Sequence, residues 1–175
     1  MADLSICIPT YNRTKYLENC LNSIFIASKK SGLKIEVCVS DNCSEEDTFS
    51  VIKKYNEKIR IIFNKNNTNI GYGKNSLKSV SMATGEFVWM LGNDDLILPD
   101  TFNIFQNLTQ TYSEVDFFYV NSFHLSSEIL DKFDLPFDTN KYDFSKLKRF
   151  SNHNKSEKLK FFELINPLKS FEFML

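Results

Sequence analysis

The sequence lacks the long apolar segments that mark membrane-spanning and secreted proteins. No stretch reaches the roughly 18 consecutive apolar residues that a spanning helix needs. The N-terminus, MADLSICIPTYN, has no basic segment followed by a long apolar run, so it is not typical of a signal peptide. We therefore expect a cytoplasmic protein.

Several short motifs are also missing. The four cysteines have no C-x-x-C spacing, which favours reduced thiols over a zinc site. The chain contains neither a P-loop nor a G-x-G-x-x-G pattern, so we expect any bound phosphate to be held mainly through a metal ion. The formal net charge of −1 argues against a domain that binds nucleic acid over its whole surface.

Short apolar runs alternate with helical patterns from Leu4 to about Val120. The runs are mostly continuous, which predicts an α/β fold with a mostly parallel sheet and helices on both faces. Ser44 is expected to cap one helix and Pro99 to open another. The predicted strands are 4–9, 34–41, 59–64, 86–91 and 115–123, and the predicted helices fall within 10–32, 44–58, 74–85 and 99–112.

The alternation fails after about Asn121. The following residues mix Phe, Asp and Lys without a clear period and predict a lobe or long loop laid over the sheet. A helix is expected from Lys155 to just before Pro167. The apolar ending, FEFML, predicts that further sheet or helix follows and that a C-terminal portion is missing.

Polar residues collect where the predicted strands end. The sets are Pro9–Thr10–Tyr11 after the first strand, Asp41 after the second, Asn69 and Gly71 after the third, and Asn93–Asp94–Asp95 after the fourth. The carboxyl ends of parallel strands meet at one edge, where open α/β folds bind ligands. The alternatives are an acid at a helix N-terminus or an Asx-turn for Asp41, turn chemistry for the Asn69 loop, and helix capping for the paired acids.

These residue types suit a nucleoside diphosphate. Adjacent carboxylates such as Asp94 and Asp95 favour Mg²⁺ or Mn²⁺, whose other ligands are phosphate oxygens and water. A metal on the diphosphate makes it a better leaving group. Asp41 is suited to accept a hydrogen bond from a base, Tyr11 to pack on that base, and Lys74 to add positive charge near phosphate.

Four segments resemble the family 2 glycosyltransferases of the GT-A fold. They are LSICIPTYNR, VSDNCSEEDT, NIGYGKNSLKSVSMATGEFVWMLGNDD and LPDTF. The form LGNDDLILPD resembles bacterial members that build surface polysaccharides. The resemblance implies a Rossmann-like nucleotide-sugar-binding core at 1–120 and an incomplete acceptor-side region at 121–175.

The resemblance also implies roles for particular residues. Thr10 and Tyr11 would border the nucleotide, and Asp41 would contact the base, usually uracil. Asn69 and Gly71 would line the donor site. The paired acids, Asp94 and Asp95, match the later acids of the family's D-x-D segment, which meets the ribose and the metal.

Two departures from the family pattern stand out. Many relatives have Asp where this chain has Gly92, so Asn93 is expected to replace the first acid's ribose contact. Inverting members use a carboxylate base from the C-terminal half to deprotonate the acceptor hydroxyl. This base is expected beyond Leu175; the weaker candidates are Asp131, Asp134, Asp138 and Glu163.

The leading hypothesis is an inverting glycosyltransferase that moves a sugar, most simply from a UDP-sugar, to a saccharide or lipid-linked saccharide. The alternative is an inactive or truncated donor-binding domain without the catalytic base. A nucleotidyltransferase is less favoured because IPTYNRTKYL is not glycine-rich. The lysine-rich stretch 141–160 is either a solvated face or a contact with an anionic membrane.

Overall fold

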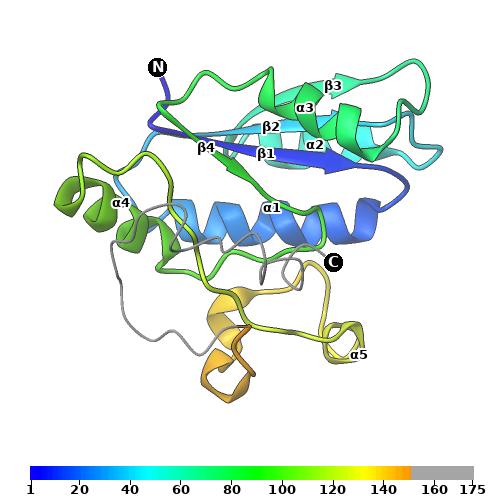
Figure 1. The fold of residues 1–175 in the computed structure, drawn as a ribbon. Coiled ribbons are helices and arrows are strands. Elements are labelled where there is room, and N and C mark those ends of the chain that lie inside the picture. The colour runs from blue at the N-terminus through cyan, green and yellow to red at the C-terminus, as the bar shows by residue number, and fades with distance from the viewer. Residues whose placement is uncertain (151–175) are drawn as a thin grey trace, which may run out of the picture. The chain divides into compact units, whose positions relative to one another are not determined.

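Four strands form one parallel sheet in the computed structural model, which describes residues 1–150 (Figure 1). The strands are β1 (Leu4–Thr10), β2 (Ile35–Asp41), β3 (Arg60–Lys65) and β4 (Phe87–Met90), and their order is β3-β2-β1-β4. The register pairs Thr10 with Asp41 at the carboxyl end of β1 and β2. The first four predicted strands are therefore confirmed to within about one or two residues at each end.

Helices cover both faces of this sheet, as predicted. Helix α3 (Tyr72–Val80) packs on one face against β1 and β2. Helix α1 (Thr14–Ser28) lies on the other face, with α2 (Thr48–Asn56) and α4 (Thr101–Thr111) beside it (Figure 1). The chain thus runs outward from β1 to β3 and returns through α3 to β4, on the opposite side of β1.

The two faces of the sheet differ in chemistry. Side chains alternate along a strand, so neighbouring residues of β1 point to opposite faces. Leu4, Ile6 and Ile8 join the apolar core together with Leu17 and Leu21 of α1. The α3 face is more polar: its buried strand residues include Ser5, Glu36 and Ser40, and α3 contributes Asn75 and Ser79. Burial on both faces explains why β1 and β2 appear as continuous runs.

Two predicted helix starts are wrong. Asp47 caps α2, since its carboxylate accepts from Ser50 N at 3.1 Å. Ser44, the predicted cap, is instead hydrogen-bonded to Asp41. Helix α4 begins at Thr101 with Asp100 at its N-cap, so Pro99 precedes the helix. The helix predicted from 74 begins at Tyr72 and ends at Val80.

The predicted fifth strand at 115–123 is also wrong. Within residues 1–150 this segment forms no strand and has one isolated bridge, between Phe123 and Arg149. The Phe118 ring packs edge-on against the rings of Phe87 and Phe105, at centroid distances of 6.0 and 5.8 Å. Ring packing therefore anchors Phe118 of this apolar segment, and backbone pairing is limited to the bridge at Phe123.

Residues 126–143 belong to the same compact unit as 1–118, whereas the described residues 119–125 and 144–150 belong to a second unit. Segment 126–143 contains α5 (Ser127–Leu130) and the 3₁₀ turn η1 (Thr139–Lys141), and the second unit contains η2 (Phe144–Lys146). Phe137 is tied to α1, because its N–H donates to Asn19 Oδ1 at 2.9 Å and its carbonyl accepts from Asn22 Nδ2 at 2.9 Å. The predicted boundary at 120 stays a prediction.

Some predictions fall on residues that the structure does not describe. The helix expected from Lys155, the candidate base Glu163 and the second half of the lysine-rich stretch 141–160 lie outside the described residues. Within residues 1–150, no helix is long and apolar enough to cross a membrane.

Candidate functional site

The strand order places a topological switch point between β1 and β4, because the chain adds β2 and β3 on one side of β1 and then adds β4 on its other side. Loops diverge at such a point and leave a crevice beyond the carboxyl ends. Asn93, after β4, donates from Nδ2 to Thr10 Oγ1 at the end of β1, at 2.8 Å. Thr10, Pro9 and Asn93 are all buried, so the structure brings these three predicted residues together behind the edge.

The loops that follow β1 and β2 are hydrogen-bonded to each other. Asn12 N donates to Ser44 Oγ at 2.9 Å, and Glu45 N donates to Asn12 Oδ1 at 2.8 Å. Asn12 and Cys43 both have positive φ, 49° and 68°. Non-glycine residues rarely adopt this conformation, and it clusters at functional sites. Tyr11 is exposed beside this junction, in a position suited to stacking.

Asp41 has one carboxylate oxygen without a hydrogen-bond donor. Its Oδ1 accepts from Ser44 N at 2.9 Å and from Ser44 Oγ at 2.5 Å. Its Oδ2 is buried and has no hydrogen bond within the described part of the chain. Lys65 Nζ lies 3.9 Å from Oδ2 and donates to Ser44 O at 2.8 Å. A buried carboxylate oxygen left without a donor requires an explanation, since such atoms are nearly always satisfied.

Side-chain amides hold the loop before α3. Asn69 Oδ1 accepts from Gly71 N at 2.9 Å and from Asn42 Nδ2 at 2.7 Å. Asn42 Oδ1 accepts from Ile70 N at 2.9 Å. Gly71 has a φ of 84°, which explains why glycine occupies this position. These bonds show turn chemistry at Asn69 and Gly71, and they bring the loop to the residue that follows Asp41. Lys74 is exposed in the first turn of α3.

The sequence prediction missed several residues that position this edge. Asn75, buried in α3, donates from Nδ2 to Ser40 O at 2.9 Å and accepts from Ser40 Oγ at 2.8 Å. Asn66 donates from Nδ2 to the Asn75 amide oxygen at 2.9 Å. The available signal was a polar residue on the sheet-facing side of α3, where an apolar residue is usual.

The paired acids are held in a tight turn. Asp95 N donates to Gly92 O at 3.1 Å, and Gly92 N donates to Asp95 Oδ2 at 3.0 Å. A Cβ on Gly92 would lie 2.7 Å from Asp95 Oδ2 and 2.9 Å from Asp94 Oδ1. The arrangement of the two carboxylates therefore explains why glycine occupies this position.

The two acids have different partners. Asp94 Oδ2 lies 2.8 Å from Arg13 Nη1, and both side chains are about half exposed. Burial around the Asp95 carboxyl, together with the neighbouring Asp94 charge, raises its pKa, although the Gly92 N–H acts in the other direction. A nearby cation favours the charged form of such a group.

The residues present fit a divalent cation that shares its ligands with phosphate. The described part of the chain contains no group of three or more side chains that would hold a metal alone. Mg²⁺ bound with a nucleotide needs only one or two carboxylates, since phosphate oxygens and water complete its octahedron. Asp94 and Asp95 supply those two carboxylates at an exposed edge.

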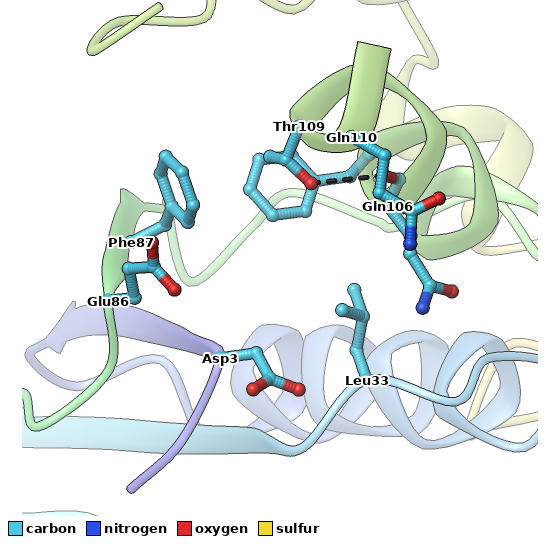
Figure 2. A pocket seen from close by; sticks show the side chains of 8 residues that line it. Asp3, Leu33, Glu86, Phe87, Gln106, Thr109 and Gln110 are labelled. Atoms are coloured by element: carbon cyan, nitrogen blue, oxygen red, sulfur yellow. Dashed lines mark hydrogen bonds between the residues drawn. The ribbon is translucent and has the colours of Figure 1, made fainter. Parts of the chain in front are cut away.

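A separate hollow of about 260 Å³ lies near the amino ends of β1 and β4, away from the polar cluster (Figure 2). Phe87 and Phe105 line it, and so do the acids Asp3 and Glu86. No Lys or Arg is among its lining residues, so it is poorly suited to hold a diphosphate.

Known proteins share this fold and sequence pattern. The family model described as glycosyl transferase family 2 matches residues 5–162. Abequosyltransferase RfbV of Salmonella typhimurium is 40% identical over 114 residues, which are 64% of this chain and 34% of that protein. The uncharacterized glycosyltransferase MJ1057 of Methanocaldococcus jannaschii is 30% identical over 151 residues, which are 84% of this chain and 50% of that protein.

A solved structure agrees with these sequence matches. The crystal structure of S. aureus TarS 1–349 in complex with UDP-GlcNAc has a TM-score of 0.58 and 31% identity, over 63% of this chain and 32% of that chain. This chain thus spans about a third of the length of RfbV and of the TarS fragment. The fold is of the GT-A type. Since the family model matches most of this chain's residues, the chain belongs to glycosyltransferase family 2.

Proposed function

We propose that the carboxyl edge of the sheet binds the nucleoside diphosphate of a UDP-sugar. We further propose that the whole protein transfers this sugar to a saccharide or lipid-linked saccharide during surface polysaccharide synthesis. The names of the relatives support both proposals: one is an abequosyltransferase, and the TarS structure holds UDP-GlcNAc.

The unsatisfied oxygen of Asp41 is the observation that carries the donor proposal. A uracil base offers an N–H donor that this oxygen lacks within the protein. The atom is buried in this structure, so base binding requires a neighbouring side chain to move. Lys65 is the nearby cation, at 3.9 Å, and about half of its side chain is exposed. Exposed Tyr11 supplies a ring on which the base can stack.

The metal corner is proposed to hold the diphosphate. Asp94 and Asp95 would bind Mg²⁺ or Mn²⁺, and a metal bound there stabilises the negative charge of the departing diphosphate. Asn93 holds Thr10 and so fixes the loop position next to the ribose. Lys74 at the start of α3 adds positive charge to the same edge, and Gly71 allows close approach of the backbone.

The transfer itself is proposed to invert the sugar's anomeric carbon. The acceptor hydroxyl forms the new C–O bond as the bond to the diphosphate breaks, and a carboxylate base takes the hydroxyl proton. Asp131 is paired with Lys15 at 2.8 Å, and Asp138 accepts from Asn140 N at 3.0 Å, so both candidates have structural partners. We therefore favour neither Asp131 nor Asp138 as the base, and we assign residues 1–150 to the donor side of the reaction.

A cytoplasmic location and contact with an anionic membrane surface belong to the same proposal. The second half of the lysine-rich stretch that suggests the contact, 151–160, lies outside the described residues. Salt-sensitive binding to anionic vesicles tests the contact, and its absence at low salt removes it.

Calorimetric titration of this 175-residue chain with UDP, with and without Mn²⁺, tests the donor proposal. We expect binding that tightens with Mn²⁺, and Asp95→Ala should remove the metal-dependent part. GDP is the control for base recognition and should bind more weakly. If UDP does not bind under either condition, the donor proposal is wrong. Unchanged metal dependence in Asp95→Ala would overturn only the metal assignment.

A further inference from the structure

An ion pair joins the two loops at the switch point. Arg13 stands directly before α1, and its Nη1 lies 2.8 Å from Asp94 Oδ2 in the loop after β4. The exposed fractions of the two side chains are 52% and 50%. The guanidinium also lies 5.8 Å from the centroid of the Tyr16 ring. Arg13 thus belongs to the candidate site, although the sequence prediction gave it no role.

The pair occupies an atom that the proposed metal corner needs. Asp95 Oδ2 already accepts from Gly92 N, and Arg13 is bound to Asp94 Oδ2. A divalent cation that approaches Asp94 is repelled by the guanidinium, so the two cations compete for one carboxylate. Exposed ion pairs of this kind contribute little to stability and exchange readily.

A diphosphate removes this competition because it supplies a second anion. The planar guanidinium presents paired N–H donors that match phosphate oxygens. Arg13 would then hold the diphosphate while Asp94 binds the metal. The positive charge stays at the same edge, and neither carboxylate lacks a cation.

We propose that Arg13 is a diphosphate-binding residue that exchanges Asp94 for the phosphate of the donor. The inference rests on the proposed donor site and adds a coupling to it. Without nucleotide, Arg13 weakens metal binding; with nucleotide, the metal and the diphosphate strengthen each other. Such coupling is reciprocal, so it is measurable from either ligand.

The test compares Arg13→Gln with Lys15→Gln. Lys15 is two residues away and forms an ion pair of equal length, 2.8 Å, with Asp131, at similar exposure. Mn²⁺ binding without nucleotide is followed by electron paramagnetic resonance. UDP and uridine binding at saturating Mn²⁺ are followed by calorimetry, and circular dichroism checks that each variant is folded.

In Arg13→Gln we expect Mn²⁺ alone to bind about threefold tighter, because Asp94 is free, and UDP to bind at least about tenfold more weakly. Uridine affinity should not change, and Lys15→Gln should match the wild type in all measurements. Opposite shifts in the two affinities are not expected from a general structural defect.

The inference is overturned if UDP affinity is unchanged in Arg13→Gln, or if Mn²⁺, UDP and uridine all weaken together. A wild-type chain that binds no UDP overturns the proposed donor site itself, before any variant is measured. The two failures are therefore distinguishable.

Discussion

Strand β2 carries two buried carboxylates, Glu36 near its amino end and Asp41 at its carboxyl end. The two differ in how fully they are hydrogen-bonded. Glu36 accepts from Ser5 Oγ at 2.7 Å and from Thr84 N at 2.7 Å, and Arg60 Nη2 lies 3.5 Å from its second oxygen. Asp41 is equally buried, but one of its oxygens has no donor. Both carboxylate oxygens of Glu36 thus have partners within the protein, whereas one oxygen of Asp41 has no hydrogen-bond donor among the described residues.

The backbone shows the same contrast. Among the described residues, those with positive φ are Asn12, Cys43 and Gly71, and all three follow the carboxyl ends of strands. The amino edge has a close-packed glycine instead: a Cβ on Gly85 would lie 2.8 Å from Ser5 N. The difference indicates that the amino edge is built for stability. The carboxyl edge keeps backbone strain and one unsatisfied polar atom, Asp41 Oδ2, that a ligand can use.

The largest expected effect is on stability, from Glu36→Ala. The change leaves the Ser5 and Thr84 donors without an acceptor inside the protein, which should lower the free energy of unfolding by about 3 kcal/mol. Urea unfolding measures this, and UDP affinity should stay within about twofold because the site lies at the other edge. A loss of UDP binding in a folded variant would contradict the division between the two edges.

Asp41→Asn should have the opposite effect to Glu36→Ala: UDP affinity should fall while stability changes little. The amide keeps an oxygen for Ser44 but puts an N–H₂ group where the base N–H must donate. We expect a 10- to 100-fold loss of UDP affinity, about 1.4–2.8 kcal/mol, with little change in unfolding. Asp47→Asn is the matched control, because asparagine caps a helix about as well as aspartate. Equal losses of affinity in both variants would remove the role of Asp41.

Gly92→Ala tests whether this glycine sets the geometry of the acids. The added Cβ would press on both carboxylates, at 2.7 and 2.9 Å, so one must move. We expect the Mn²⁺-dependent part of UDP binding to weaken about tenfold, which is about 1.4 kcal/mol. The counterpart, Gly85→Ala, should reduce stability and leave UDP affinity unchanged in the folded protein. Full Mn²⁺ dependence in Gly92→Ala would show that the acids tolerate the shift.

The gathering of polar residues at the carboxyl edge was predictable because it depends on topology. Parallel strands bring their carboxyl ends to one edge, so the position of Asp41 followed from the end of an apolar run. The partners of the acids were not predictable in this way. Arg13 and Asp94 are 81 positions apart, and no local pattern links them. Glu36 lies inside a strand-like run, and no sequence pattern indicated its contacts with Ser5, Thr84 and Arg60.

Local signals also failed where two residues suited one role. Ser44 and Asp47 are both good helix caps, and the tertiary bond from Ser44 to Asp41 decided between them. The run at 115–123 has the composition of a strand, but ring contacts of Phe118 replace strand pairing there. In both cases contacts between distant segments outweighed the local preference.

The smallest expected effect is on the pH dependence of stability, which we attribute in part to Glu36 at the amino edge. Burial alone would raise the pKa of Glu36, but hydrogen bonds from Ser5 and Thr84 outweigh it and hold the pKa below its ordinary value. A lowered carboxyl pKa contributes stability that is present above the unfolded-state value, about 4.3, and is lost as the pH falls through the folded-state value. Unfolding free energy should therefore decline below about pH 5 in the wild type.

In Glu36→Gln, which starts from a lower stability, the decline should be shallower, because a group that does not titrate cannot contribute to it. Urea unfolding at several pH values between about 3 and 6 measures the two slopes. Equal slopes would mean that exposed acids such as Glu46 carry the acid sensitivity, and that the buried cluster at the amino edge does not respond to pH.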